Sequence, residues 1–248
     1  MASRVAHQTR GDILGLAGAL ARQIPGVCGG LVFGSWARGT PTSPLSDIDV
    51  LLLVEHRSRT IGARKLATEL SDGQLSVVVH DRYSLAQLAR SDWSFVEHLK
   101  REHLPVYGDF ETLVGLLDPA FRSTGEIRQE IADHLPVAHR LKQPHGLAGR
   151  HLLAYGRLFA ATKSAAILDG ILEGQPVFDR HMALASVAVR RPQLAQPLEQ
   201  IRRLEPFWLR MRRRDHVALP WTPRHDLDRL AAHAAATASI LHELSQSP

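Results

Sequence analysis

The sequence has very little of several features that mark specialised classes of protein. It contains one cysteine, Cys28, which can neither form an internal disulfide nor make a zinc site alone. No uninterrupted run of about 18 apolar residues occurs, which excludes a transmembrane helix. Residues 1–8 lack the basic-then-apolar order of a secretory signal. We therefore expect a cytoplasmic protein with no membrane partner.

Lysine is also scarce, because only four of the 30 basic residues are lysines. With 44% hydrophobic and 22% charged residues, the composition is that of a globular protein. Charge is unevenly divided: residues 1–118 carry 12 basic and 13 acidic residues, and residues 119–248 carry 18 and 12. Pro119 disfavours helical backbone at Asp118. We predict two domains, residues 1–118 and residues 119–248.

Hydrophobic periodicity predicts an α+β fold, with a small mixed β-sheet and flanking helices followed by an all-α helical bundle. In the first domain, short β-branched apolar runs predict strands, and the stretches between them that show helical periodicity predict helices. Predicted strands are 27–33, 48–54 (central, because it is nearly all apolar), 75–79 and 105–108, and predicted helices are 9–24, 60–71 and 84–104. In the helix over 60–71 we expect Ile61, Leu66 and Leu70 to face inward. The second domain shows helical periods at about 121–134, 147–170, 181–190, 193–213 and 224–244.

Two groups of residues between the first two predicted strands indicate chemistry. Gly34-Ser35 follows a strand and precedes a helical turn. Glycine lets a phosphate approach the backbone, and the serine hydroxyl with helix N-terminal amides can hold its oxygens. The alternative interpretation of such a pair is an ordinary helix N-cap.

The second group is a pair of carboxylates. Asp47 and Asp49 lie two residues apart at the start of a strand, so they share one face. Two unpaired carboxylates are poor core residues, but they are good ligands for Mg²⁺ or Mn²⁺. The alternative is a charged strand end that protects a sheet edge. A phosphate cradle facing a carboxylate pair is the minimum for metal-assisted transfer from a nucleoside triphosphate (NTP).

The combined pattern also carries a family resemblance. Gly34-Ser35-x-Ala37-Arg38-Gly39 followed by Ser46-Asp47-Ile48-Asp49 resembles the signature of the DNA polymerase β-type nucleotidyltransferase superfamily. Its small bacterial members, such as aminoglycoside adenylyltransferases and minimal nucleotidyltransferases, are the most similar.

The resemblance implies a function and roles for individual residues. Asp47 and Asp49 would be the catalytic metal ligands, and Gly34, Ser35 and Arg38 would hold the triphosphate. An NTP, with ATP expected, would donate a nucleoside monophosphate to an acceptor hydroxyl, with release of pyrophosphate. The helical domain would close the site for the acceptor, which can be a small molecule, a protein or an RNA. For Arg38, a salt bridge to Asp47 or Asp49 is the alternative.

One departure from the family pattern bears on activity. The family usually places a third carboxylate on the next strand, but the face with Gln74, Ser76, Val78 and His80 has none. Ser76 or Gln74 is expected at the vacated position, and Asp81 has the opposite parity. Either His80 or another group replaces the base, no strong base is needed, or the chain is a catalytically impaired nucleotide-binding or antitoxin-like interaction module.

Two features of the second half are candidates for ligand contacts. Lys163 lies four residues after Phe159 on the predicted helix over 147–170, on a largely apolar face. It either extends to water or reaches the triphosphate. A basic cluster comprises Arg202, Arg203, Arg210, Arg212, Arg213 and Arg214. The cluster either tracks an RNA backbone or is a solvated helical face.

Overall fold

The structure is a computed structural model of the chain. It describes residues 9–39, 48–71, 75–117, 123–141, 151–212 and 224–246. The chain divides into two compact units, Met1–Phe121 and Arg122–Pro248, and each is described by itself. The different roles that the sequence predicts for residues 1–118 and 119–248 stay predictions.

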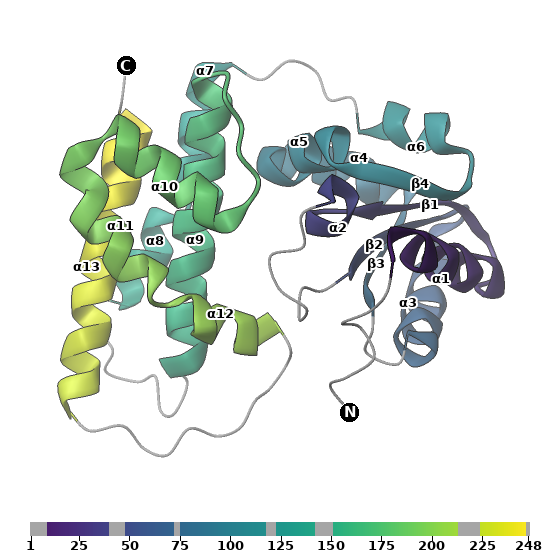
Figure 1. The fold of residues 1–248 in the computed structure, drawn as a ribbon, viewed down its shortest axis with the longest axis horizontal. Coiled ribbons are helices and arrows are strands. Elements are labelled where there is room, and N and C mark those ends of the chain that lie inside the picture. Colours follow the sequence, from purple (N-terminus) through teal and green to yellow (C-terminus); the bar gives the residue numbers. More distant parts are fainter. Residues whose placement is uncertain are drawn as a thin grey trace. The chain divides into compact units, whose positions relative to one another are not determined.

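The N-terminal unit is built on one four-stranded mixed sheet (Figure 1). Its strands are β1 (Val27–Phe33), β2 (Ile48–Val54), β3 (Leu75–Asp81) and β4 (His103–Gly108). They lie in the order β3-β2-β1-β4. β1 is antiparallel to both β2 and β4, and β2 is parallel to β3. The predicted mixed sheet is confirmed, with β2 in its interior.

Helices cover both faces of this sheet. They are α1 (Arg10–Gln23), α2 (Ser35–Arg38), the short 3-10 helix η2 (Arg57–Arg59), α3 (Thr60–Leu70), α4 (Arg82–Ser91), α5 (Trp93–Arg101) and α6 (Phe110–Leu116). α1 and α3 pack on the face that carries Val50 and Leu52, whereas α4, α5 and α6 pack on the face of Leu51 and Leu53 (Figure 1). Alternate residues of β2 therefore contribute to two separate cores, because successive side chains point to opposite faces.

Two sequence predictions for this unit need correction. The single helix expected over 84–104 is two helices, because Asp92 ends α4 and caps α5, its Oδ1 accepting from the Phe95 amide at 2.9 Å. In α3, Ile61 is 82% exposed, Leu70 is 41% exposed, and Ala63 and Ala67 are buried instead. The small alanine side chains let the helix backbone pack against the sheet, so the larger residues at its ends point outward.

The described part of the C-terminal unit is entirely helical, as predicted. Its elements are α7 (Thr124–Ala132), α8 (Leu135–Leu141), α9 (His151–Leu172), α10 (Arg180–Arg190), the 3-10 helix η3 (Pro192–Leu194), α11 (Ala195–Arg202), α12 (Glu205–Arg212) and α13 (Arg224–Gln246). α9 is the central helix and contacts α7, α8, α10, α11, α12 and α13. It buries residues on most of its surface, including Leu158, Phe159 and Leu168, as expected for a helix that is apolar all round. The helix expected over 193–213 is divided into η3, α11 and α12.

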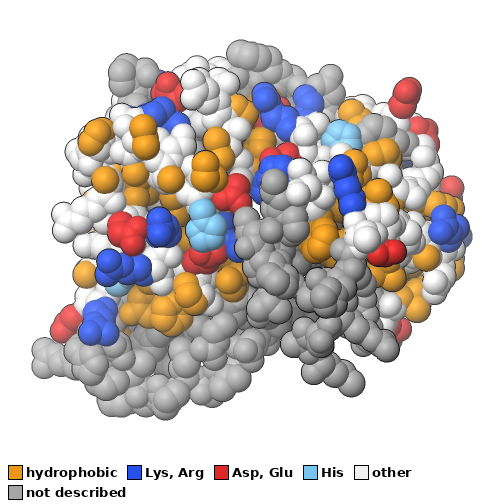
Figure 2. All heavy atoms as spheres, viewed as in Figure 1, with side chains coloured by type: hydrophobic (Ala, Val, Ile, Leu, Met, Phe, Trp, Pro, Cys, Tyr) orange, Lys and Arg blue, Asp and Glu red, His pale blue; other side chains and the backbone are white. Residues whose placement is uncertain are grey.

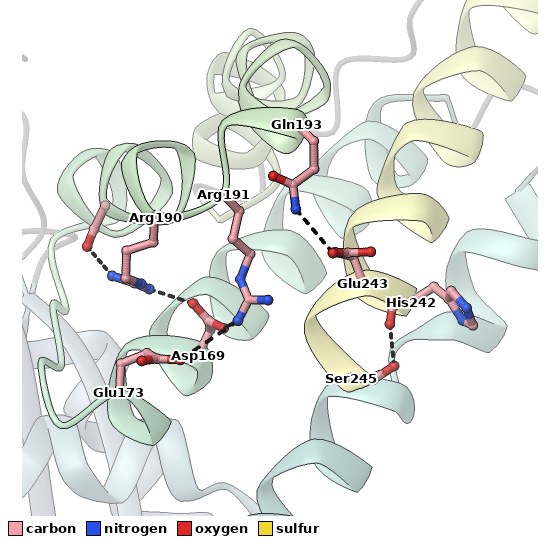
Figure 3. Close-up of polar contacts among 9 residues, drawn as sticks. Asp169, Glu173, Arg190, Arg191, Gln193, His242, Glu243 and Ser245 are labelled. Atoms are coloured by element: carbon pink, nitrogen blue, oxygen red, sulfur yellow. Dashed lines mark hydrogen bonds and ion pairs between the residues drawn. The ribbon is translucent and has the colours of Figure 1, made fainter. Parts of the chain in front are cut away.

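A buried carboxylate ties two helices of this unit together (Figure 3). Asp169 of α9 is fully buried, and it pairs with Arg190 and Arg191 at the end of α10. The Arg191 Nη2 atom lies 2.6 Å from Asp169 Oδ1 and 3.9 Å from Glu173 Oε1. This one carboxylate therefore bridges two guanidinium groups and holds the end of α10 against α9.

Within the described residues, the helices are too short or too polar for any of them to cross a membrane.

Candidate active site

The predicted phosphate-binding segment is a tight turn between β1 and α2. Gly34 has φ 80° and ψ −150°, a backbone conformation that is open essentially to glycine alone. Its carbonyl accepts a hydrogen bond from the Arg38 amide at 3.0 Å. Ser35 is partly exposed, whereas Gly34 and the following Trp36 and Ala37 are buried. The turn thus presents Ser35 at its surface.

The Asp49 carboxylate lies directly beside this turn. Asp49 is on β2, in register with Phe33, the last residue of β1 before Gly34. A Cβ atom placed on Gly34 would be 3.3 Å from Asp49 Oδ2. The structure therefore brings Asp49 to the Gly34–Ser35 turn. Asp47, the other predicted metal ligand, lies outside the described residues.

Ser76 is the neighbour of Asp49 on the other side. The two residues are in register across the parallel pair β2–β3, and both are partly buried. A carboxylate on β3 would have to occupy position 76 to lie beside Asp49 on the same face of the sheet. Gln74, the other predicted occupant of the vacated family position, lies outside the described residues.

His80 lies too far along β3 to replace a carboxylate at Ser76. Four strand residues separate their Cα atoms by about 13 Å, and the His80 Nδ1 atom is 3.3 Å from Ser84 Oγ. Burial lowers the pKa of His80, the Arg64 guanidinium lowers it further, and Asp81 opposes both. His80 is therefore mostly neutral at pH 7, and it contacts the start of α4.

Asp81 has a structural role as the N-cap of α4. Its carboxylate accepts hydrogen bonds from the amides of Tyr83 and Ser84, at 2.9 and 3.0 Å, and from Thr60 Oγ1 at 3.3 Å. Burial raises the pKa of Asp81, but the hydrogen bonds from Ser84, Tyr83 and Thr60 outweigh burial and hold that pKa below its usual value. This carboxylate stabilises the helix start.

Arg38 at the end of α2 pairs with Glu102, a partner that the sequence analysis did not identify. The Arg38 Nη1 atom contacts Glu102 Oε2, and the His98 Nε2 atom lies 3.0 Å from the same oxygen. Burial raises the pKa of Glu102, but its interactions with the neighbouring His98 and Arg38 side chains outweigh burial, so the pKa lies below its usual value. The only sequence signal is the i,i+4 spacing of His98 and Glu102.

Of the two predicted metal ligands, Asp49 is among the described residues, and its surroundings suit Mg²⁺ or Mn²⁺. Asp49 and Ser76 offer hard oxygen donors, and the missing Cβ of Gly34 leaves space beside Asp49 Oδ2. Among the described residues, no group of three or more His, Cys, Asp or Glu side chains is placed to hold a metal ion. Because Asp47 is not among them, the metal stays a prediction.

Lys163 belongs to an aromatic cluster of the helical unit. Its Nζ atom lies 5.5 Å from the ring centroid of Trp208, and the Arg180 guanidinium lies at the same distance from that ring. Trp208 is buried, so the cationic stems cover an apolar surface. A contact between Lys163 and a triphosphate stays a prediction.

The basic cluster is only partly described. Arg202 and Arg203 are exposed and both lie near Glu199, at 3.5 and 3.6 Å between nitrogen and oxygen. On the face that Figure 2 draws, the Lys and Arg side chains of the described residues lie among acidic and apolar ones. These two arginines therefore belong to a solvated helical surface, and RNA binding stays a prediction.

Comparison with known proteins agrees with the geometry of the N-terminal unit. The four-stranded mixed sheet with its flanking helices is consistent with the fold of a nucleotidyltransferase domain. Residues 20–102 match the family model of the nucleotidyltransferase domain. This segment is a nucleotidyltransferase domain, consistent with the DNA polymerase β-type superfamily. No curated protein matches the chain.

We expect Gly34→Ala to lower the free energy of unfolding by about 1–3 kcal/mol, because alanine is strained at this φ and ψ. It should also weaken nucleotide binding, since the new methyl group would contact Asp49 Oδ2. Denaturant unfolding and calorimetry with MgATP measure the two effects. The matched control is Gly15→Ala on α1, where an added Cβ meets nothing within 4 Å, so stability should be unchanged or slightly higher. Equal stability of both variants would contradict the expectation.

Proposed function

We propose that the chain is a metal-dependent nucleotidyltransferase that transfers a nucleoside monophosphate from an NTP, with ATP as the expected donor, to an acceptor hydroxyl. The observation that carries the proposal is the Asp49 carboxylate beside the Gly34–Ser35 turn. It occurs within a segment that matches the nucleotidyltransferase domain family.

The reaction needs the triphosphate held in line with the acceptor. The acceptor oxygen forms a bond to the α-phosphorus as the bond from that phosphorus to the bridging oxygen breaks, and pyrophosphate leaves. The hydroxyl proton passes to a base or to water. Ser35 and the turn would orient the phosphate oxygens, and this positioning supplies much of the rate in phosphoryl transfer. When bound by Asp49 and Asp47, Mg²⁺ supplies positive charge that stabilises the phosphate oxygens.

A second candidate function is a nucleotide-binding or antitoxin-like interaction module on the same fold. Ser76 favours it, because Ser76 is in register with Asp49 and offers no carboxylate. A site with fewer negative charges holds a divalent cation less firmly.

The deciding experiment incubates the full chain with each labelled NTP, with Mg²⁺ or Mn²⁺, and with cell extract. Pyrophosphate release reports transfer, and the small-molecule, protein or RNA fraction that carries the label identifies the acceptor class. We expect metal-dependent labelling with ATP. If no NTP gives labelled product or pyrophosphate while calorimetry still detects metal-dependent NTP binding, the second candidate replaces the first.

Ser76→Asp tests the missing carboxylate. Without metal, the new carboxylate opposite Asp49 should destabilise the domain by about 0.2–1 kcal/mol through like-charge repulsion. With Mn²⁺ it should stabilise the domain, because binding to the folded state raises stability, and turnover should increase. Thermal unfolding with a chelator or with Mn²⁺, together with pyrophosphate release, measures this. Ser76→Asn is the neutral control of equal size. Identical behaviour of the two variants would show that the missing group is supplied elsewhere.

A further inference from the structure

Glu102 is attached to the phosphate-binding turn through both its backbone and its side chain. It follows α5 and directly precedes His103, which is in register with Phe33 of β1. Its carbonyl oxygen accepts a hydrogen bond from the Gly34 amide at 3.2 Å, and its own amide donates to the His98 carbonyl at 2.9 Å. Glu102 is thus fixed between α5 and the sheet at the point where the turn begins.

The side chain of Glu102 holds the other end of the same turn. Its Oε2 atom contacts Arg38 Nη1, four residues after Gly34, and lies 3.0 Å from His98 Nε2. The carboxylate side chain is only 14% exposed, so loss of its charge would leave Arg38 without this partner in a poorly solvated place. One residue therefore fixes both Gly34 and Arg38, which bracket Ser35.

His98 connects the Glu102–Arg38 pair to the surroundings of the Asp49 carboxylate. A Cβ atom on Gly34 would lie 3.8 Å from His98 Cε1 and 3.3 Å from Asp49 Oδ2. The imidazole and the carboxylate are therefore on the same side of Gly34. The His98 ring also packs edge-on against the Phe33 ring, with the two ring centroids 5.9 Å apart.

We infer that Glu102, with Arg38 and His98, is a positioning residue that holds the Gly34–Ser35 turn in the conformation that accepts a triphosphate. The effect on nucleotide rests on the proposed function, whereas the effect on the turn does not. A direct alternative is that Arg38 is a phosphate ligand that Glu102 withholds. The two differ in sign: loss of the Glu102 charge weakens NTP binding if Glu102 positions the turn, and strengthens it if Glu102 competes for Arg38.

The test compares Glu102→Gln with Glu97→Gln in the full chain. Glu97 is a matched control because it lies on α5, the helix that Glu102 directly follows, and its side chain is similarly buried, with 12% exposure, but it pairs with Arg101 and Lys100. Hydrogen exchange of the amides of residues 34–39 reports the turn without any nucleotide. Calorimetry and steady-state kinetics with MgATP report NTP affinity, KM and kcat.

We expect Glu102→Gln to speed hydrogen exchange over residues 34–39 by about tenfold or more. It should also raise KM for the NTP about 10–100-fold, the range found when a residue that supports a ligand-binding residue is replaced. Glu97→Gln should change neither. Arg38→Met should reproduce the faster exchange, and adding it to Glu102→Gln should give little further effect, because the two groups act as a pair. Unchanged exchange in Glu102→Gln, or tighter NTP binding, overturns the inference. If wild type binds and turns over no NTP, the proposed function fails, and the exchange result still decides the role of Glu102.

Discussion

Replacing Asp49, the proposed metal ligand, by asparagine is expected to reduce nucleotidyl transfer by more than about 100-fold, since removal of a ligand should exceed the 10–100-fold losses caused by substituting the residues that support it. Asparagine keeps the size of the side chain between β1 and β3 but removes the charge that a divalent cation needs. Asp49 is only partly buried, so the free energy of unfolding should change by less than about 1 kcal/mol. Pyrophosphate release, Mn²⁺ titration and denaturant unfolding measure the three quantities.

The matched control for this prediction is Asp109→Asn. Asp109 caps α6 by accepting a hydrogen bond from the Thr112 amide at 3.0 Å, and asparagine is about as good an N-cap. Activity and stability should both be close to those of wild type. Asp47→Asn tests the other predicted ligand with the same assays. If Asp49→Asn retains full metal-dependent turnover, the metal is not bound at this carboxylate.

The second large effect is expected in the helical unit. Asp169→Asn should destabilise it by about 3 kcal/mol, because Arg190 and Arg191 then lose their buried counter-ion. Their side chains are 22% and 14% exposed, so water can compensate only in part. Hydrogen exchange of peptides from α9 and α10, read as a function of denaturant, measures this unit separately from the other.

Glu173→Gln is the control for the same network. The Glu173 carboxylate is 48% exposed and 3.9 Å from Arg191 Nη2, and exposed pairs contribute about 0–1 kcal/mol. Glu173→Gln should therefore lower the free energy of unfolding much less than Asp169→Asn does. Equal and small effects of both substitutions would show that Asp169 does not hold α10 against α9.

The strands that carry the site could be predicted from the sequence because their signals are local. β1 and β2 are short apolar runs bounded by glycine and polar residues, and their observed bounds, Val27–Phe33 and Ile48–Val54, agree with the predicted ones. The buried face of α3 was not predictable in the same way. Which side of a short helix is buried depends on how closely its backbone approaches the sheet, and hydrophobicity alone wrongly favoured Ile61 and Leu70 over the alanines.

The residues of the candidate site also fall into those that local sequence could predict and those that it could not. Gly34, Ser35 and Asp49 are close in sequence and on successive elements, so their spacing predicted their proximity. Arg38 and Glu102 are separated by 64 positions, and only the pairing of β4 with β1 brings them together. No periodicity within the chain encodes such a contact.

The position of β4 at the edge of the sheet also bears on self-association. An open edge offers unpaired backbone groups on which another chain can add a strand. β4 contains Pro105, in register with Leu31 where the β1–β4 pairing is irregular, and a proline has no amide hydrogen to donate. With only six residues and this interruption, β4 makes a poor template for a further strand. The same short strand that places Glu102 beside the turn therefore also discourages the addition of another chain at this edge of the sheet.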